Sequence, residues 1–294
     1  MTNFSRLPFV MAAQVLLALL MLGTGPTLRA DSRPPVLAPP PLRPALSSFS
    51  YADLADLASS APLVVRVQPR KIARLEPARA KGLSAGMARL YIEAKTEALV
   101  AGQTPLGETL RYLVDVPLDP RGKLPVLKKK SVVLFARAVP GRAGELQLIA
   151  PDAQLLWDGA LDARLRAILA ELLAAGAPPP IAGLREAIHV SGNLAGEGET
   201  QLFLATANGE PAAITVNRSP GQPPRWSVSF SEVLEQASPV PARDSLPWYR
   251  LACFLPPELP ADVTLSGNQQ DRELAATDYA YVLRQLGACP RTRR

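Results

Sequence analysis

Apolar and polar residues alternate along the first half of the chain with the two-residue period of a β-strand. The alternation is clearest over residues 89–98, where every second side chain is apolar or small. This pattern is typical of a strand that buries one face and exposes the other. Residues 63–67 are compact and rich in β-branched side chains, which is typical of a strand. Residues 131–139 are almost continuously apolar, as in a strand at the centre of a sheet.

Two further strands are predicted over residues 110–116 and 145–150, and a short helix over residues 51–59 opens this half. About five or six antiparallel strands within about 90 residues predict a small β-barrel-like sheet. The five-stranded, OB-like barrel is one candidate for this arrangement, although strand number alone does not identify it.

A connecting helix is predicted over residues 161–175. Its apolar side chains recur with a period of 3.6 residues and form one stripe. Gly176 and three prolines at 178–180 end the helix. The sequence therefore predicts a barrel-like domain over residues 49–176, closed by this helix, and a second domain over residues 181–294. The stripe consists of Leu161, Leu165, Ile168, Leu169 and Leu172.

The second half begins with a predicted hairpin at Asn208-Gly209, a dipeptide that suits a two-residue type I′ turn. Such a turn would pair Phe203 with Ile214 across the two strands. A third strand is predicted over residues 225–230, and a helix over residues 271–286. The predicted fold class is α+β: a barrel-like half, a connecting helix, and an antiparallel sheet with a C-terminal helix.

The N-terminal thirty residues have the pattern of a secretory signal. Arg6 precedes an apolar run over residues 7–22, and Ala30 is a plausible cleavage position. Residues 31–48 are rich in proline, which predicts an extended linker. We expect a periplasmic or secreted protein. The alternative is an uncleaved N-terminal anchor, and only that alternative places the protein in the membrane.

The chain contains two cysteines, Cys253 and Cys289. In an oxidising compartment two such residues most simply form one disulfide bond. The sequence therefore predicts a Cys253–Cys289 bond within the second domain, with the two Cα atoms within about 7 Å of each other.

Basic residues gather between residues 66 and 89, where seven cations accompany the single acid Glu76. Such segregation favours an anionic partner, such as an envelope protein, an acidic polymer or a lipid head group. The alternative is a solvated strand face with no partner, and nucleic acid is not expected for an exported chain. Lys128-Lys129-Lys130 would join this region if the fold brings the two together. The candidate binding residues here are Arg66, Arg70, Lys71 and Arg74.

Trp226 and Trp248 are the further candidate binding residues, because aromatic rings beside arginine suit recognition surfaces. The alternative is that both rings belong to a small core that packs over the disulfide.

Catalytic residues are not predicted. His189 is the only histidine, and it lies in a strand-like segment that suits a structural hydrogen bond. A metal cluster needs more nitrogen or thiolate ligands than the chain contains, so neither a metal nor another cofactor is expected. Glu197 and Glu199 are the candidates for the alternative function, a carboxylate-dependent hydrolase of cell-envelope material.

The signal, the proline-rich linker, the β-rich body and the segment Trp-Tyr-Arg-Leu-Ala-Cys-Phe-Leu-Pro at 248–256 together resemble exported bacterial proteins of no assigned function. The resemblance implies no active site. The sequence thus favours a non-enzymatic envelope protein with a binding or scaffolding role.

Overall fold

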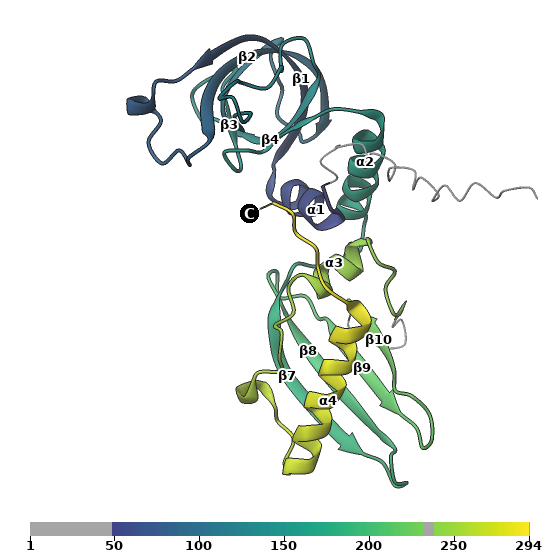
Figure 1. Ribbon diagram of the computed structural model, residues 1–294. Coiled ribbons are helices and arrows are strands. Elements are labelled where there is room, and N and C mark those ends of the chain that lie inside the picture. The colour runs from purple at the N-terminus through teal and green to yellow at the C-terminus, as the bar shows by residue number, and fades with distance from the viewer. Residues whose placement is uncertain (1–48, 232–237, 294) are drawn as a thin grey trace, which may run out of the picture. The chain divides into compact units, whose positions relative to one another are not determined.

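The computed structural model describes residues 49–231 and 238–293, which form an α+β fold with two antiparallel sheets and four α-helices (Figure 1). Both sheets belong to one unit, residues 47–294. The predicted signal (1–30) and linker (31–48) lie outside the described residues. The division into domains at residues 176–181 stays a prediction. Over the described ranges, no helix is long and apolar enough to cross a bilayer.

The first sheet has the strand order β3-β2-β1-β4-β5, and β6 also pairs with β4. The alternation over residues 89–98 corresponds to β2, where Leu90, Ile92 and Ala94 are completely buried. The strands are β1 (Leu63–Arg74), β2 (Met87–Ala101), β3 (Thr109–Pro117), β4 (Val132–Ala138), β5 (Leu146–Leu148) and β6 (Gln154–Leu156).

The described residues contain no closed barrel. The two end strands, β3 and β5, form no ladder with each other, and a single parallel bridge joins Arg111 to Glu145, the residue before β5. Two hydrogen bonds hold the seam: the Arg111 N–H donates to the Gly144 carbonyl at 2.8 Å, and the Asp115 N–H donates to the Pro151 carbonyl at 2.7 Å. The barrel-like, OB-like part of the prediction therefore remains unconfirmed.

Two helices follow the expected sequence signals. In α1 (Tyr51–Ser60), Ser50 and Asp53 form a reciprocal capping box. In α2 (Gly159–Leu173), the Asp158 carboxylate accepts the Leu161 N–H, so the helix begins two residues before the predicted start. The helix also ends early, because Ala174 is already extended. Four residues of the predicted stripe are buried: Leu161, Leu165, Ile168 and Leu169.

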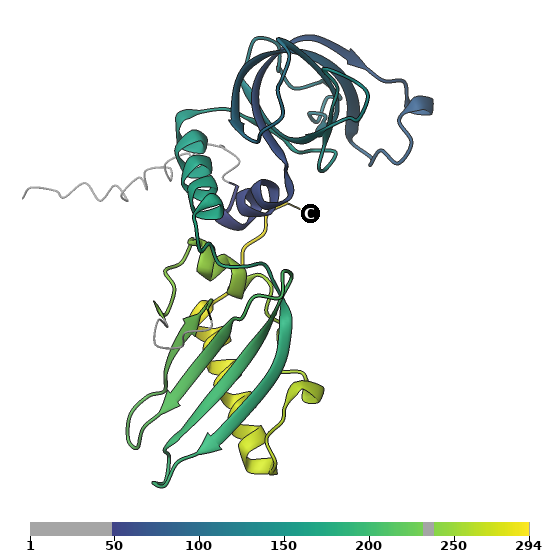
Figure 2. The same cartoon turned by 180° about the vertical axis from the view of Figure 1, so that it is seen from behind.

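The second sheet has the order β11-β10-β9-β8-β7, and α4 (Gln269–Leu286) covers one of its faces (Figures 1 and 2). The short helix α3 (Leu246–Ala252) precedes α4 in the chain. The strands are β7 (Ile181–Ser191), β8 (Gly198–Thr206), β9 (Ala213–Arg218), β10 (Arg225–Ser229) and β11 (Ser238–Pro239).

The predicted register of the β8–β9 hairpin is wrong by one residue. Ile214 pairs with Leu202, and Phe203 pairs with Ala213. The turn is not the predicted two-residue loop, because the Gly209 N–H donates to the Thr206 carbonyl and the strand resumes only at Ala213. A shift of one residue exchanges the two faces of a strand. Leu202 is consequently buried in the core, while Phe203 is partly exposed.

The C-terminal segment is bound to α1 through a buried carboxylate. Asp53, 1% exposed, accepts hydrogen bonds from the Ser50 N–H, the Thr292 N–H and hydroxyl, and the Arg293 N–H. Burial alone would raise the pKa of Asp53, but these hydrogen bonds outweigh it and lower the pKa. Asp56 accepts a second set, from Arg291 and from the Tyr249 hydroxyl.

A disulfide bond joins Cys253 and Cys289, whose Cα atoms are 5.1 Å apart. Cys253 is the C-cap of α3, and Cys289 lies two residues beyond Gly287, the C-cap of α4. The bond therefore fastens the end of α4 to the end of α3, and the prediction is confirmed.

Replacing Asp53 with Asn should lower the free energy of unfolding by about 2–4 kcal/mol, because an amide cannot accept all four hydrogen bonds. Urea denaturation at neutral pH measures this. The matched control is Asp262→Asn, an exposed position that should change stability by less than about 0.5 kcal/mol. Equal losses in the two variants would contradict the role of Asp53.

The same carboxylate gives a pH dependence. Its folded pKa lies below the unfolded value of about 3.9, so its contribution is complete above that pH and is lost as the pH falls through the folded pKa. Acidification below about pH 4 should therefore destabilise the unmodified protein more than the Asp53→Asn variant. If the free energies of unfolding of the two proteins fall with equal slopes below about pH 4, this linkage is excluded.

Replacing both cysteines with Ser should lower the unfolding free energy by about 3–4 kcal/mol, the chain-entropy value for a loop of this size. A free-thiol assay on denatured, unreduced protein should detect no thiol in the unmodified chain. Two reactive thiols per chain in freshly exported protein would show that the bond is absent.

Candidate functional site

Charge is segregated between the two halves of the chain. Residues 63–156, which contain the first sheet, have 16 basic and 8 acidic residues, a net charge of +8, whereas residues 157–294 have 12 and 15, a net charge of −3. All seven lysines lie between Lys71 and Lys130. The first sheet is therefore the basic part of the protein.

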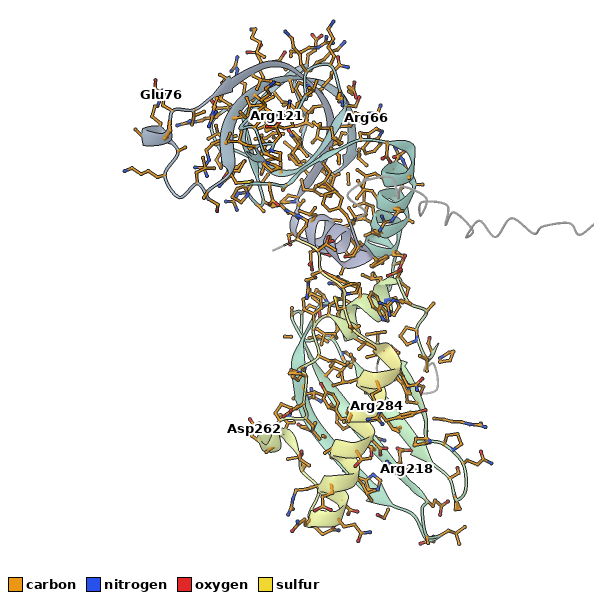
Figure 3. All side chains as sticks on the ribbon, in the orientation of Figure 1. Arg66, Glu76, Arg121, Arg218, Asp262 and Arg284 are labelled. Carbon is orange, nitrogen blue, oxygen red and sulfur yellow. A yellow bond between two sulfur atoms is a disulfide. The ribbon has the colours of Figure 1, made fainter. Side chains whose placement is uncertain are left out.

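A basic groove of about 640 Å³ lies on the outer face of β1 and β2. Arg66, Gln68 and Arg70 alternate along β1, so their side chains reach the same face. Arg66 is labelled on the first sheet in Figure 3. The groove is lined by Arg66, Gln68, Arg70, Lys95, Thr96, Glu97 and Ser131.

The lysine loop, Lys128-Lys129-Lys130, lies beside this groove. The Lys129 N–H donates to the Pro69 carbonyl, and the Gln68 side-chain amide donates to the Lys129 carbonyl, both at 3.2 Å. Lys129 has a φ of 65°, a left-handed conformation that these two bonds hold in place. The fold thus brings the lysine loop to the middle of β1.

Two of the cations in this region are neutralised by strand neighbours. The Arg66 guanidinium lies 3.2 Å from the Glu97 carboxylate and stacks on the Trp157 ring at 5.2 Å. Lys71 donates to Glu93 at 2.8 Å, and this hydrogen bond lowers the pKa of Glu93. Such exposed pairs add little stability, but they reduce the local charge.

The other cations are not neutralised in this way. Arg70, Arg74 and Lys95 form no ion pair with any residue that the structure describes, nor does the lysine loop. An anion that enters the groove would therefore meet the unpaired cations Arg70 of β1 and Lys95 of β2, with the lysine loop beside them.

The predicted binding residues do not all gather at this groove. Arg66 and Arg70 line it, whereas Lys71 and Arg74 lie farther along β1, beyond a bulge at Pro69. Lys95 was not among the predicted site residues. The alternation of β2 places it on the exposed face, but only the register opposite Gln68 brings it to the groove.

Both predicted tryptophans are buried. Trp248 is 1% exposed, and its indole N–H donates to the Leu286 carbonyl at 2.9 Å. Trp226 is 6% exposed and pairs with Val216 across the second sheet. Neither ring presents a face to solvent, so neither contributes to the surface of the groove.

His189 belongs to a buried polar network in the second sheet. Its Nδ1 lies 2.7 Å from the Thr200 hydroxyl, which donates to Asp278, and Arg218 donates to the same carboxylate at 2.8 Å. The network joins β7, β8 and β9 to α4. With His189, Thr200 and Asp278 all buried, it is placed to hold the helix on the sheet rather than to meet a substrate.

The two candidate carboxylates face local partners. Glu197 accepts the Leu194 N–H, and Glu199 accepts the Gln201 side chain. Neither lines the basic groove or the second cavity described below. No group of three or more His, Cys, Asp or Glu side chains that could hold a metal ion occurs within the described ranges.

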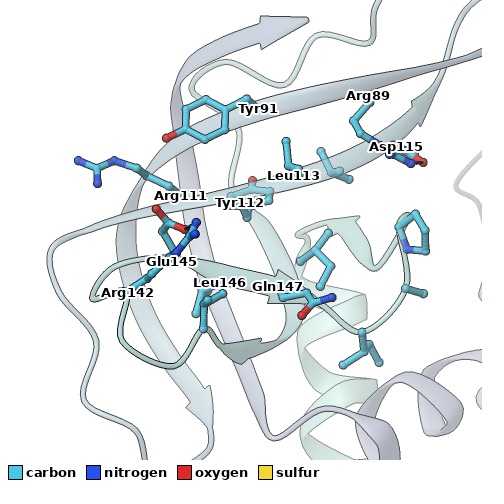
Figure 4. A pocket seen from close by; sticks show the side chains of 16 residues that line it. Arg89, Tyr91, Arg111, Tyr112, Leu113, Asp115, Arg142, Glu145, Leu146 and Gln147 are labelled. Atoms are coloured by element: carbon cyan, nitrogen blue, oxygen red, sulfur yellow. Dashed lines mark hydrogen bonds and ion pairs between the residues drawn. The ribbon is translucent and has the colours of Figure 1, made fainter. Parts of the chain in front are cut away.

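A second cavity, of about 620 Å³, opens between β3 and β5 (Figure 4). We refer to it as the seam pocket. Its walls combine residues from the outer face of the sheet, such as Tyr91 and Leu113, with inward-facing residues such as Tyr112. Burial raises the pKa of Tyr112, whose hydroxyl donates to Gln154, so it stays protonated at neutral pH.

Comparison with protein-family models and with curated proteins found no match to this chain. The geometry of the two surfaces is therefore the basis for assigning function.

Proposed function

We propose that this protein is an exported, non-enzymatic binding or scaffolding component of the bacterial envelope, and that its basic groove contacts an anionic partner. The observation that carries the proposal is the position of the lysine loop against β1. Its two hydrogen bonds to Gln68 and Pro69 add three lysines to a strand face that already carries Arg70 and Lys95.

Electrostatics supports this assignment. Like charges held on one surface repel one another, and an anion that binds among them relieves that repulsion. The chemistry common to the candidate partners is a phosphate or carboxylate group, whether it belongs to a lipid head group, an acidic polymer or another envelope protein. Arginine and lysine are the side chains that bind such groups.

Export is supported by the N-terminal pattern and by the disulfide, since such bonds persist mainly in oxidising compartments. A periplasmic or secreted location is part of the proposal. The barrel-like, OB-like form of the first sheet is likewise proposed, as a rigid support for the groove.

If the signal is cleaved near Ala30, N-terminal sequencing of the protein from an envelope fraction should begin close to Asp31. Intact chains beginning at Met1 and recovered from the membrane would support the uncleaved anchor instead.

Reversing two cations of the groove, with Arg70→Glu and Lys95→Glu together, should weaken binding to vesicles of phosphatidylglycerol and phosphatidylcholine. Each basic residue near an anionic surface contributes about 1 kcal/mol, so we expect at least about a thirtyfold loss of affinity. Co-sedimentation with the vesicles measures this affinity. A soluble polyphosphate, tested in parallel, distinguishes a lipid surface from a free phosphate polymer.

The matched control reverses Arg225 and Arg284 on the second sheet and α4, which changes the net charge equally. The control should bind nearly as well as the unmodified protein, and binding should weaken as salt screens the charges. Equal losses in both double variants, or no loss in either, would contradict the assignment of the groove.

A further inference from the structure

The seam between β3 and β5 stays open because its two sides have unequal lengths. The two donors on β3, Arg111 and Asp115, are four residues apart, whereas their acceptors, Gly144 and Pro151, are seven residues apart. The chain on the β5 side must therefore diverge from β3 between these two hydrogen bonds. The seam pocket occupies this opening (Figure 4).

The backbone of Leu113 faces the opening. Hydrogen bonds from Thr96 to the Glu108 carbonyl and from Leu118 to the Gly86 carbonyl show that even-numbered residues of this segment point toward β2. Odd-numbered residues then point toward the seam, as the bonds of Arg111 and Asp115 confirm. Within the described residues, Leu113 is paired only with Tyr91 on β2, and no ladder or bridge pairs it with a strand on the seam side.

An apolar surface lies next to this unpaired backbone. Tyr91 and Leu113 are direct cross-strand partners on β2 and β3, and they are 41% and 46% exposed. Both line the seam pocket. In such a pair the side chains are close together, so they form one apolar shelf.

The charges around the pocket leave Arg111 available to a ligand. At one end of the pocket, Arg89 donates two hydrogen bonds of 2.7 Å to Asp115, so the two charges neutralise each other. At the other end, Glu93 accepts a hydrogen bond from Lys71 and lies 3.9 Å from Arg111. Glu145, which also lines the pocket, accepts a hydrogen bond from Arg142 at 3.3 Å. The Arg111 guanidinium forms no hydrogen bond with a described side chain, so its donors remain available for a carboxylate.

From these features we propose that the seam pocket binds an extended peptide segment of a partner protein by β-strand addition. One residue of the peptide pairs with the N–H and carbonyl of Leu113. A neighbouring apolar side chain packs on Tyr91 and Leu113, and an acidic side chain reaches Arg111. Main-chain hydrogen bonds supply affinity in this mode, and the side-chain sites supply selectivity. This site is separate from the basic groove.

The proposal is tested with a library of capped hexapeptides of alternating polar and apolar residues, with and without one glutamate. Fluorescence anisotropy should show preferential binding of peptides that carry an apolar residue beside glutamate. N-methylation of the one amide that pairs with Leu113 should weaken the best peptide about tenfold, the effect of losing one hydrogen bond. Methylation of the next amide should have less effect.

Two variants examine the protein side. Leu113→Pro removes the N–H that points into the seam without removing a bond to β2, and should weaken binding about tenfold. Arg111→Gln should abolish the preference for glutamate and leave binding of the neutral peptides unchanged. Arg121→Gln, an exposed position in the loop before β4, is the matched control and should change neither. Circular dichroism verifies that Leu113→Pro is folded, and Arg111→Gln remains informative if it is not.

The proposal is overturned if no peptide of the library binds. It is also overturned if methylation at any amide leaves the affinity of the best peptide unchanged and both variants bind that peptide as tightly as the unmodified protein does. Dimerisation of the unmodified chain that Leu113→Pro removes would show that a second copy occupies the edge instead, which also overturns it. The Arg70→Glu, Lys95→Glu double variant should bind the peptides as the unmodified protein does. The peptide-binding proposal can therefore fail independently of the proposal that the basic groove binds anions.

Discussion

The unequal pairing of β1 is the constraint on which both surfaces of the first sheet depend. β1 pairs with β2 along most of its length, but with β4 only over Leu63–Val67. Beyond Val67, none of the described strands lies beside this edge of β1. Proline cannot donate to a ladder, so Pro69 is tolerated there, and the lysine loop supplies the missing donor to its carbonyl. The basic groove exists because this edge is covered by a loop and not by a strand.

As β4 is too short to cover the whole of β1, so β5 is too short to cover β3, and the sheet stays open on that side as well. β2 has 15 residues, whereas β5 has only 3. A strand that short cannot match β3, and in the described part of the chain the two form no ladder. The bridge between Arg111 and Glu145 and the hydrogen bond from Asp115 to Pro151 join β3 to the segment that contains β5. The groove and the seam pocket thus arise from one cause, the contrast between long strands early in the sheet and short strands late in it.

Periodicity predicted the elements but not their neighbours. The alternation in β2, the apolar stripe of α2 and the disulfide each follow from residue type and spacing, which local physics determines. The β8–β9 register failed because the turn that sets it is longer than Asn208-Gly209 suggested. Lys95 and the lysine loop could not be assigned to one surface, because their proximity depends on the register of β1 against β2. It also depends on the hydrogen bonds that join the loop to Pro69 and to Gln68, which is 61 residues from Lys129. The phase of the Leu113 backbone depends on pairing in the same way.

The two open edges of this sheet are treated differently, and the difference bears on function. Lysine beside an edge strand discourages pairing with other chains. The β1 edge has three lysines in its loop, with Lys95 and Arg70 on the adjoining face, so this edge carries a concentrated positive charge. At the seam, an exposed tyrosine and leucine lie next to an unpaired backbone, a combination that proteins usually avoid. We therefore propose that partners cover both edges, an anionic partner at the charged edge and an extended peptide at the unprotected one.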